Sequence, residues 1–167
     1  MKNNLGKKYL ENAVVEFKKL KELGDKTFGQ IKDEDFFWSP DEESNSIAII
    51  VRHLSGNMIS RWTDFLTTDG EKENRKRDEE FEKLFYTDKD DVLKRWEKGW
   101  KRLFDTMSEL NDEDLLKEVR IRNQPLSVLA AINRQLTHYG YHIGQIVYIG
   151  KHLNEVNWKS LSIPKKR

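Results

Sequence analysis

The sequence predicts an all-α protein, a four-helix bundle with a long crossover between its second and third helices. Apolar residues recur at steps of three and four residues in four long segments, which is the spacing of one helical face. Gly and Pro, which interrupt helices, number only nine and three among 167 residues. No segment shows the alternation of a convincing sheet. A chain of this length fits one domain, which we expect to span residues 1–167.

The first two helices are marked by apolar stripes and a capping segment. Leu5 opens the first stripe, and we expect this helix to extend toward Ile31. The segment KDEDFFWSPDEESNS then breaks the pattern with Pro40, and its small polar residues offer N-caps for the second helix. This helix is therefore expected at residues 46–66.

A charged crossover and two more helices complete the chain. The crossover, residues 67–88, has a turn signal at Asp69 and Gly70 and only four apolar anchors, which are Phe81, Leu84, Phe85 and Tyr86. Thr87, followed three residues later by Asp90, resembles a capping box and opens the third helix. NDEDLLKE then predicts a capped turn and VRIRN an extended segment. Pro125 or Ser127 begins the fourth helix, which is expected to continue to about residue 153.

Charge and composition weaken the case for several function classes. Lys and Arg number 30 against 29 acidic residues, so no electrostatic argument favours nucleic acid or an anionic membrane. Acidic neighbours cancel most of the charge on the basic residues of KENRKRDEEFEK, which are Lys72, Arg75, Lys76 and Arg77. There is no cysteine, so any thiol chemistry must use a thiol from elsewhere. We find no secretory signal and no apolar run of roughly 18 residues, and we expect a cytoplasmic protein.

The histidines carry the functional signal. His138 and His142 are four residues apart, so their side chains lie on one helical face about 6 Å apart. His53 sits at the border of the second helix's apolar stripe, where it would face another helix. Gln145 follows His142 by one turn and could hydrogen-bond a ligand, a water or a substrate group. His152, about 15 Å further along the axis, is interpreted as a surface residue.

Three neutral imidazoles would form a site for Zn, Ni, Cu or Fe with positions left open for water or substrate. The alternative for the histidine pair is two half-buried residues hydrogen-bonded to their neighbours. No glutamate directly follows His138, so the base of the HExxH metalloproteases is missing from its expected place and peptide hydrolysis ranks low. A general base from the chain would come from the acidic residues Asp64, Asp78, Glu79 and Glu80. Trp62, Trp96 and Trp100 are expected in the core, and Gly140 and Gly144 at a close helix contact.

Two motifs resemble the DinB/YfiT-like superfamily of four-helix bundles. NSIAIIVRHLSGN is similar to its second-helix motif, and HYGYHIGQI to its fourth-helix H-x-x-x-H-x-x-Q element. Within the superfamily, SRWTDFLTTDGEK resembles an uncharacterised Bacillus-type branch. The resemblance implies that His53, His138 and His142 match the family's metal-ligand positions, with zinc or nickel as the metal. It also implies a homodimer and, in several branches, thiol-dependent transferases or isomerases that use bacillithiol, mycothiol or glutathione.

Two functional hypotheses are consistent with these observations. The first is a metal-dependent enzyme, a thiol transferase or a hydrolase, with a small-molecule substrate; most plausibly it transfers a low-molecular-weight thiol to an electrophile. The second is a dimeric, non-catalytic binding or stress-response module whose metal site is structural or vestigial. The sequence names neither the substrate nor the metal.

Overall fold

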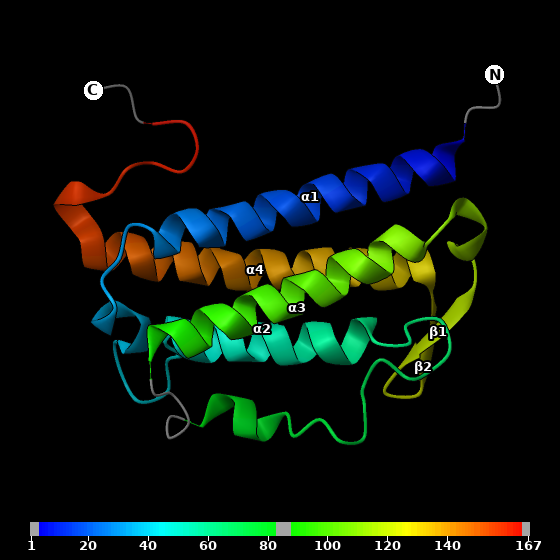
Figure 1. Ribbon diagram of the computed structural model, residues 1–167, viewed down its shortest axis with the longest axis horizontal. Coiled ribbons are helices and arrows are strands. Elements are labelled where there is room, and N and C mark those ends of the chain that lie inside the picture. The colour runs from blue at the N-terminus through cyan, green and yellow to red at the C-terminus, as the bar shows by residue number, and fades with distance from the viewer. Residues whose placement is uncertain (1–3, 83–87, 165–167) are drawn as a thin grey trace.

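The computed structural model describes residues 4–82 and 88–164 and consists mainly of four long helices (Figure 1). These are α1 (Leu5–Phe28), α2 (Ile47–Trp62), α3 (Lys89–Glu109) and α4 (Val128–Asn154). The all-α prediction is confirmed, and so is the long crossover, which returns along the outer side of α2 before α3 begins (Figure 1). None of the described helices is both long and apolar enough to cross a membrane.

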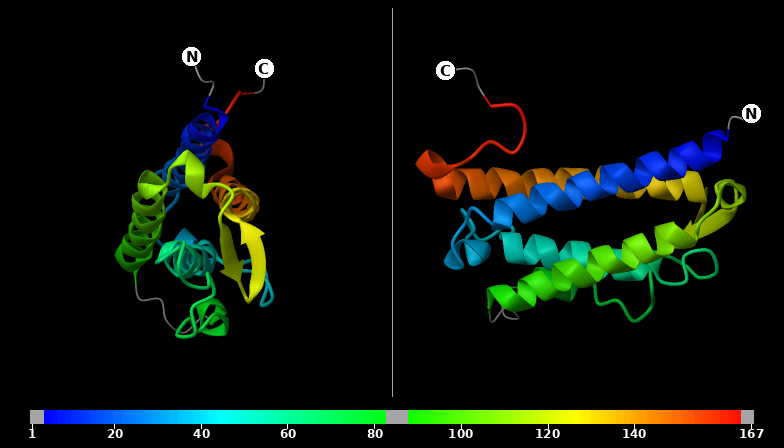
Figure 2. Two further views of the ribbon diagram at one scale, coloured as in Figure 1. Left: turned by 90° about the vertical axis from the view of Figure 1, so that its right-hand side faces the viewer. Right: turned by 45° about the horizontal axis from the view of Figure 1, so that its top comes forward.

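The helices pack in two pairs around an aromatic core. α2 packs chiefly on α3 and α1 chiefly on α4, and the view along the bundle shows the crossover beneath α2 (Figure 2). Trp62, Trp96 and Trp100 are at most 2% exposed, as the sequence predicts. Phe17 and Tyr139 pack against Trp100 with ring centroids 6.5 and 6.0 Å apart. Burial of such side chains contributes roughly 1.5–3 kcal/mol each, so this core is the main source of the fold's stability.

The helix ends differ from the expected ones for local backbone reasons. α2 ends at Trp62, four residues early, because Thr63 is extended and Asp64 adopts a positive φ of 48°. The expected cap Thr87 lies outside the described residues, and Asp88 is the N-cap of α3, accepting a hydrogen bond from the backbone of Asp91. Of the two predicted starts for α4, Ser127 is the N-cap.

Two short strands occupy the connection between α3 and α4. The capped turn is the 3₁₀ helix η4 (Asp112–Asp114), and VRIRN forms most of β1 (Glu118–Ile121) and the turn after it. β1 pairs antiparallel with β2 (Gln124–Ser127), so this part of the connection forms a small hairpin that was not predicted. Its two turn residues, Arg122 and Asn123, have φ values of 54° and 61°. This turn conformation matches the right-handed twist of the strands.

Asp69 attaches the crossover to this hairpin. Its carboxylate accepts hydrogen bonds from the backbone N–H groups of Glu71, Arg122 and Asn123 at 2.7, 2.9 and 2.7 Å. The next residue, Gly70, donates its N–H to the carbonyl of Arg120 at 2.8 Å. The predicted turn signal at Asp69 and Gly70 thus marks the point at which the crossover between α2 and α3 meets the hairpin between α3 and α4.

One packing prediction is wrong. Gly140 and Gly144 do not lie at a close helix contact, because a Cβ at either position would meet no described atom within 4 Å. Close approaches occur instead at other glycines, among them Gly99, where a Cβ would lie 2.9 Å from Ser55 Cα, and Gly150, where it would lie 2.4 Å from Thr27. A glycine in a helix therefore does not by itself show which face is covered.

Replacing Asp69 should loosen the crossover from the hairpin. We expect Asp69→Ala to lower the free energy of unfolding at pH 7 by about 1–3 kcal/mol, because three backbone donors lose a charged acceptor. Burial alone would raise the pKa of Asp69, but these three donors outweigh it and hold the pKa below 3.8. The stabilisation is therefore present at neutral pH and is lost as pH falls from 3.8 through the lower folded-state pKa.

Urea denaturation of both proteins at several pH values between neutrality and strong acid measures this effect. Asp78→Ala, which removes a carboxylate that is 97% exposed, is the matched control and should change stability by less than about 0.5 kcal/mol. An Asp69→Ala protein as stable as the control at pH 7 would contradict the role given to Asp69.

Candidate metal centre

Three histidines from two helices converge beside the core. His53 comes from α2, and His138 and His142 from successive turns of α4. One ring nitrogen of each lies within 4.8 Å of the others, and the Nε2 atoms of His53 and His138 are 3.3 Å apart. His53 and His142 are buried and His138 is half-buried. The helical spacing places two imidazoles on one face, and helix packing adds the third.

The spacing of these nitrogens fits a small divalent ion. Zinc binds imidazole nitrogens at about 2.0–2.1 Å in tetrahedral geometry, which places two ligand nitrogens roughly 3.3–3.4 Å apart. The 3.3 Å separation between His53 and His138 matches this value. A donor set of three imidazoles and no thiolate suits zinc, nickel, copper or iron.

Hydrogen bonds orient two of the three rings. Nδ1 of His53 lies 2.9 Å from Oε2 of Glu80, and Nδ1 of His142 lies 2.8 Å from Oε1 of Gln145. Both oxygens accept, so both Nδ1 atoms carry the proton and donate it. The Nε2 lone pairs are then left for a metal, which is the arrangement that metal-ligating histidines usually adopt.

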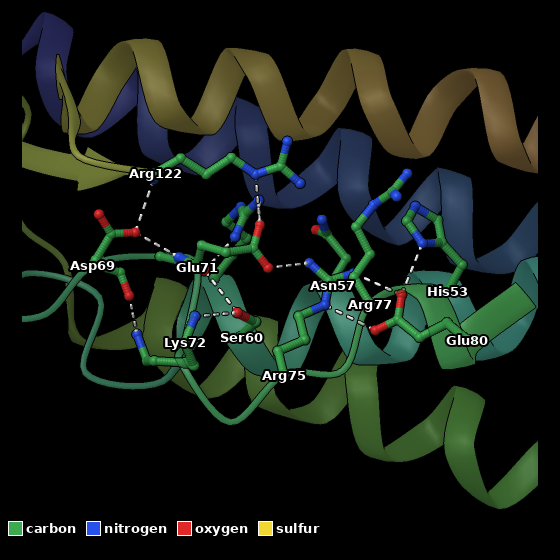
Figure 3. Close-up of polar contacts among 12 residues, drawn as sticks. His53, Asn57, Ser60, Asp69, Glu71, Lys72, Arg75, Arg77, Glu80 and Arg122 are labelled. Atoms are coloured by element: carbon green, nitrogen blue, oxygen red, sulfur yellow. Dashed lines mark hydrogen bonds and ion pairs between the residues drawn. The ribbon is translucent and has the colours of Figure 1, made fainter.

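Glu80 is itself held by an arginine. Arg75 donates from Nε to Oε1 at 2.8 Å and from Nη2 to Oε2 at 2.7 Å, and the carboxylate is buried (Figure 3). Burial alone would raise the pKa of Glu80, but the hydrogen bonds from His53 and Arg75 and the charge of Arg75 outweigh it and lower the pKa. Glu80 therefore stays ionised at neutral pH and accepts the proton of His53 Nδ1.

Gly56 provides the space in which Glu80 approaches α2. A Cβ at this position would lie 2.2 Å from Oε1 and 2.9 Å from Cδ of Glu80. Glu80 belongs to η2 (Asp78–Phe81), the short 3₁₀ helix of the crossover. A glycine three residues after His53 was the signal in the sequence for this approach, although nothing in the sequence says which side chain fills the space.

Of the four acidic residues considered as a general base, only Glu80 contacts a histidine of the cluster. Asp78 and Glu79 pair with Arg77 and Lys76 at the surface, at 3.2 and 2.8 Å. Asp64 lies just beyond the end of α2, where its carbonyl accepts hydrogen bonds from the backbone of Thr67 and Thr68. Since Glu80 is engaged by both His53 and Arg75, it positions a ring and is not a free base.

The burial of the α4 histidines keeps them uncharged. Burial, followed by the charges of His142 and His53, lowers the pKa of His138 to about 3. Burial is also the main cause that lowers the pKa of His142 to about 4, against the opposing hydrogen bond to Gln145. Both rings are neutral at pH 7, which is the protonation state that binds a metal.

The cluster opens on a cavity of about 650 Å³, within the roughly 300–1,000 Å³ range of small-molecule sites. Besides the three histidines, the cavity is lined by five arginines, by Asn57, Gln135, Thr137 and Tyr141, and by Phe81. His152 lies elsewhere, exposed and packed against Trp38 with ring centroids 5.4 Å apart, as the surface interpretation predicts. The three histidines thus lie where a small molecule could reach a metal bound by them.

The comparisons with known proteins identify a family without an assigned activity. The chain matches a family model described as "Protein of unknown function (DUF1572)" over residues 4–167, which include the three histidines and Glu80. Neither the curated proteins nor the solved structures contain a significant match. The match does not name the DinB/YfiT-like superfamily.

Removing the partner of Glu80 should strongly destabilise the protein. Arg75→Gln leaves a buried carboxylate without its cation, so we expect it to cost about 3–5 kcal/mol of unfolding free energy by urea denaturation. Arg95→Gln is the matched control, because Arg95 pairs with Asp91 at 2.7 Å on the surface, where such pairs contribute about 0–1 kcal/mol. If the two variants were equally stable, Glu80 would not depend on Arg75.

Proposed function

We propose that this chain, which belongs to the DUF1572 family of proteins of unknown function, is a metal-dependent enzyme with His53, His138 and His142 as the ligands of one divalent metal. Zinc and nickel are the metals that we propose. The observation that carries the proposal is the convergence of three imidazoles, two with Nδ1 bound to an oxygen acceptor, at the wall of a cavity.

The cavity favours catalysis over a structural role for the metal. Structural zinc sites are closed by four protein ligands, whereas catalytic sites use three and leave one position open. Three histidines with a cavity of about 650 Å³ beside them match the second arrangement. A non-catalytic binding module with a structural metal, the alternative hypothesis, would need no such space.

The reaction that we propose is transfer of a small thiol to an electrophile. A zinc ion lowers the pKa of bound water to about 7 and deprotonates a bound thiol, which creates a nucleophile at neutral pH. The thiol is a co-substrate, because the chain contains no cysteine. A C–S bond forms as the electrophile's leaving group departs with its bonding electrons, and the thiol proton leaves with the solvent or the leaving group.

The chain's own residues orient and enclose the reactants. Glu80 and Gln145 fix the rings of His53 and His142, and the buried positions of these rings exclude water from the core side of the site. The order of the helices and the positions of the histidines support the further proposal that the family is a branch of the DinB/YfiT-like superfamily. The homodimer implied by that resemblance stays a prediction.

Loss of one ligand should remove metal and activity together. We expect the purified chain to bind one zinc or nickel ion, and His142→Ala to lower the affinity at least a hundredfold in a competition titration with a chelating dye. His152→Ala, which replaces a surface histidine, is the control and should bind metal normally. Undiminished metal binding by His142→Ala would refute the assignment of the ligands.

The same proteins test the reaction. A screen of low-molecular-weight thiols against alkylating electrophiles should show conjugation by the metal-loaded chain and by His152→Ala, and none after chelation or in His142→Ala. A protein that binds metal and is greatly stabilised by it, yet conjugates no thiol and binds none, would support the structural alternative.

Crowding Glu80 should weaken the metal site without removing a ligand. Gly56→Ala places a methyl group against the Glu80 carboxylate, so we expect His53 to lose its acceptor and metal affinity to fall about 10- to 100-fold. Gly140→Ala is the matched control, since its Cβ would meet no described atom within 4 Å. Circular dichroism checks that both variants fold. Equal metal affinity in the two would show that Glu80 does not support the site.

A further inference from the structure

We propose that the cavity beside the histidines contains an oxyanion subsite, in which Arg77, Arg134 and the amide nitrogen of Asn57 bind a carboxylate or phosphate group of the substrate. The inference rests on the proposed function, because it places the anionic group of a molecule whose thiol reaches the three histidines. It adds a substrate class that the metal centre alone does not indicate.

The charge of the cavity wall is the first argument. Five arginines line the cavity, and no carboxylate is among its described lining residues. Three of them are engaged by two glutamates: Glu71 pairs with Arg61, Arg75 and Arg122 at 2.9–3.1 Å, and Glu80 pairs with Arg75. This network already carries one more positive charge than negative, before the remaining two arginines are considered.

The positive charges of the other two arginines, Arg77 and Arg134, are only weakly neutralised. Arg77 pairs at 3.2 Å with Asp78, a side chain that is 97% exposed and therefore strongly hydrated. The side chain of Arg134 makes no hydrogen bond or ion pair with the described part of the chain. Arg77 reaches the cavity from the crossover and extends beside His53 in Figure 3, and Arg134 comes from α4. Their guanidinium groups offer N–H donors in the geometry that carboxylates and phosphates accept.

A chain of hydrogen bonds turns Asn57 into a donor toward the cavity. The indole of Trp62 can only donate, and it donates to the hydroxyl of Tyr139 at 3.0 Å. That hydroxyl in turn donates to Oδ1 of Asn57 at 3.0 Å. The oxygen of Asn57 is thereby occupied, and its NH₂ group is left for a ligand. The arginines and Asn57 therefore present donors only, which favours a ligand group rich in acceptors.

Gln135 is a buried amide side chain beside the proposed subsite. It is 3% exposed, lines the cavity, and its Oε1 has no hydrogen-bond partner among the described residues. A buried unpaired amide oxygen costs free energy, so a rearrangement of this side chain that brought a donor to Oε1 would be favourable. Gln135 lies one turn before His138 on α4, which places it at the junction of the metal centre and the subsite.

The spacing of the subsite residues from the histidines along α2 and α4 indicates the distance between the thiol and the oxyanion of the ligand. Asn57 follows His53 by one turn of α2, and Arg134 precedes His138 by one turn of α4. One turn advances about 5.4 Å along the axis. A thiol separated from its oxyanion by two or three carbons spans that distance.

Two thiols of equal length test the subsite by isothermal titration calorimetry on the zinc-loaded protein. We expect 3-mercaptopropionate to bind at least tenfold more tightly than 3-mercapto-1-propanol, which replaces the carboxylate by a hydroxymethyl group. In the double variant Arg77→Gln/Arg134→Gln this preference should fall below about threefold. Arg102→Gln, an exposed arginine of α3 outside the cavity, is the control and should keep the preference.

A preference below twofold in the wild-type protein, or one unchanged in the double variant, would overturn the proposal. Titration of inorganic phosphate into the metal-free proteins separates this failure from failure of the proposed function. If neither thiol binds but phosphate binds the wild type and not the double variant, the thiol reaction is wrong and the subsite stands. If both thiols bind equally and phosphate does not bind, the subsite is wrong and the thiol reaction stands.

Discussion

The carboxylate of Glu80 connects the crossover to the centre of the molecule. A buried carboxylate costs several kcal/mol unless charged partners surround it, and Glu80 has Arg75 on one side and His53 on the other. The same contact therefore stabilises the crossover against α2 and fixes the orientation of a histidine at the metal centre. Gly56 makes the contact possible by leaving the surface of α2 open beneath the carboxylate.

A continuous polar network extends this contact to the far end of the crossover. Arg75 also pairs with Glu71, and Glu71 pairs with Arg122 in the turn of the hairpin. The carboxylate of Asp69 holds that turn by accepting hydrogen bonds from the backbone N–H groups of Arg122 and Asn123. The hairpin and the crossover, which lie far apart in the sequence, thus form one wall of the cavity and place arginines on it. The same ion pairs thus hold Glu80 at the metal centre and the part of the crossover from which Arg77 reaches the cavity.

The helices and the histidine pair could be predicted from the sequence because their spacing is periodic. Ser127 at the start of α4 and the buried tryptophans follow from capping and apolar stripes, and His138 and His142 follow from a spacing of four. The contact of Glu80 could not be predicted, because the crossover has no periodicity to distinguish it from three other acidic residues. The covered glycines could not be predicted either, since a missing side chain does not show which neighbour approaches.

X-ray absorption at the zinc edge, recorded before and after a thiol is added, tests the central claim most directly. The account predicts three imidazole nitrogens at about 2.0–2.1 Å with one additional light ligand, and replacement of that ligand by a sulfur at about 2.3 Å when the thiol binds. A spectrum without imidazole scattering, or with a fourth imidazole and no change on addition of the thiol, would contradict an open three-histidine centre.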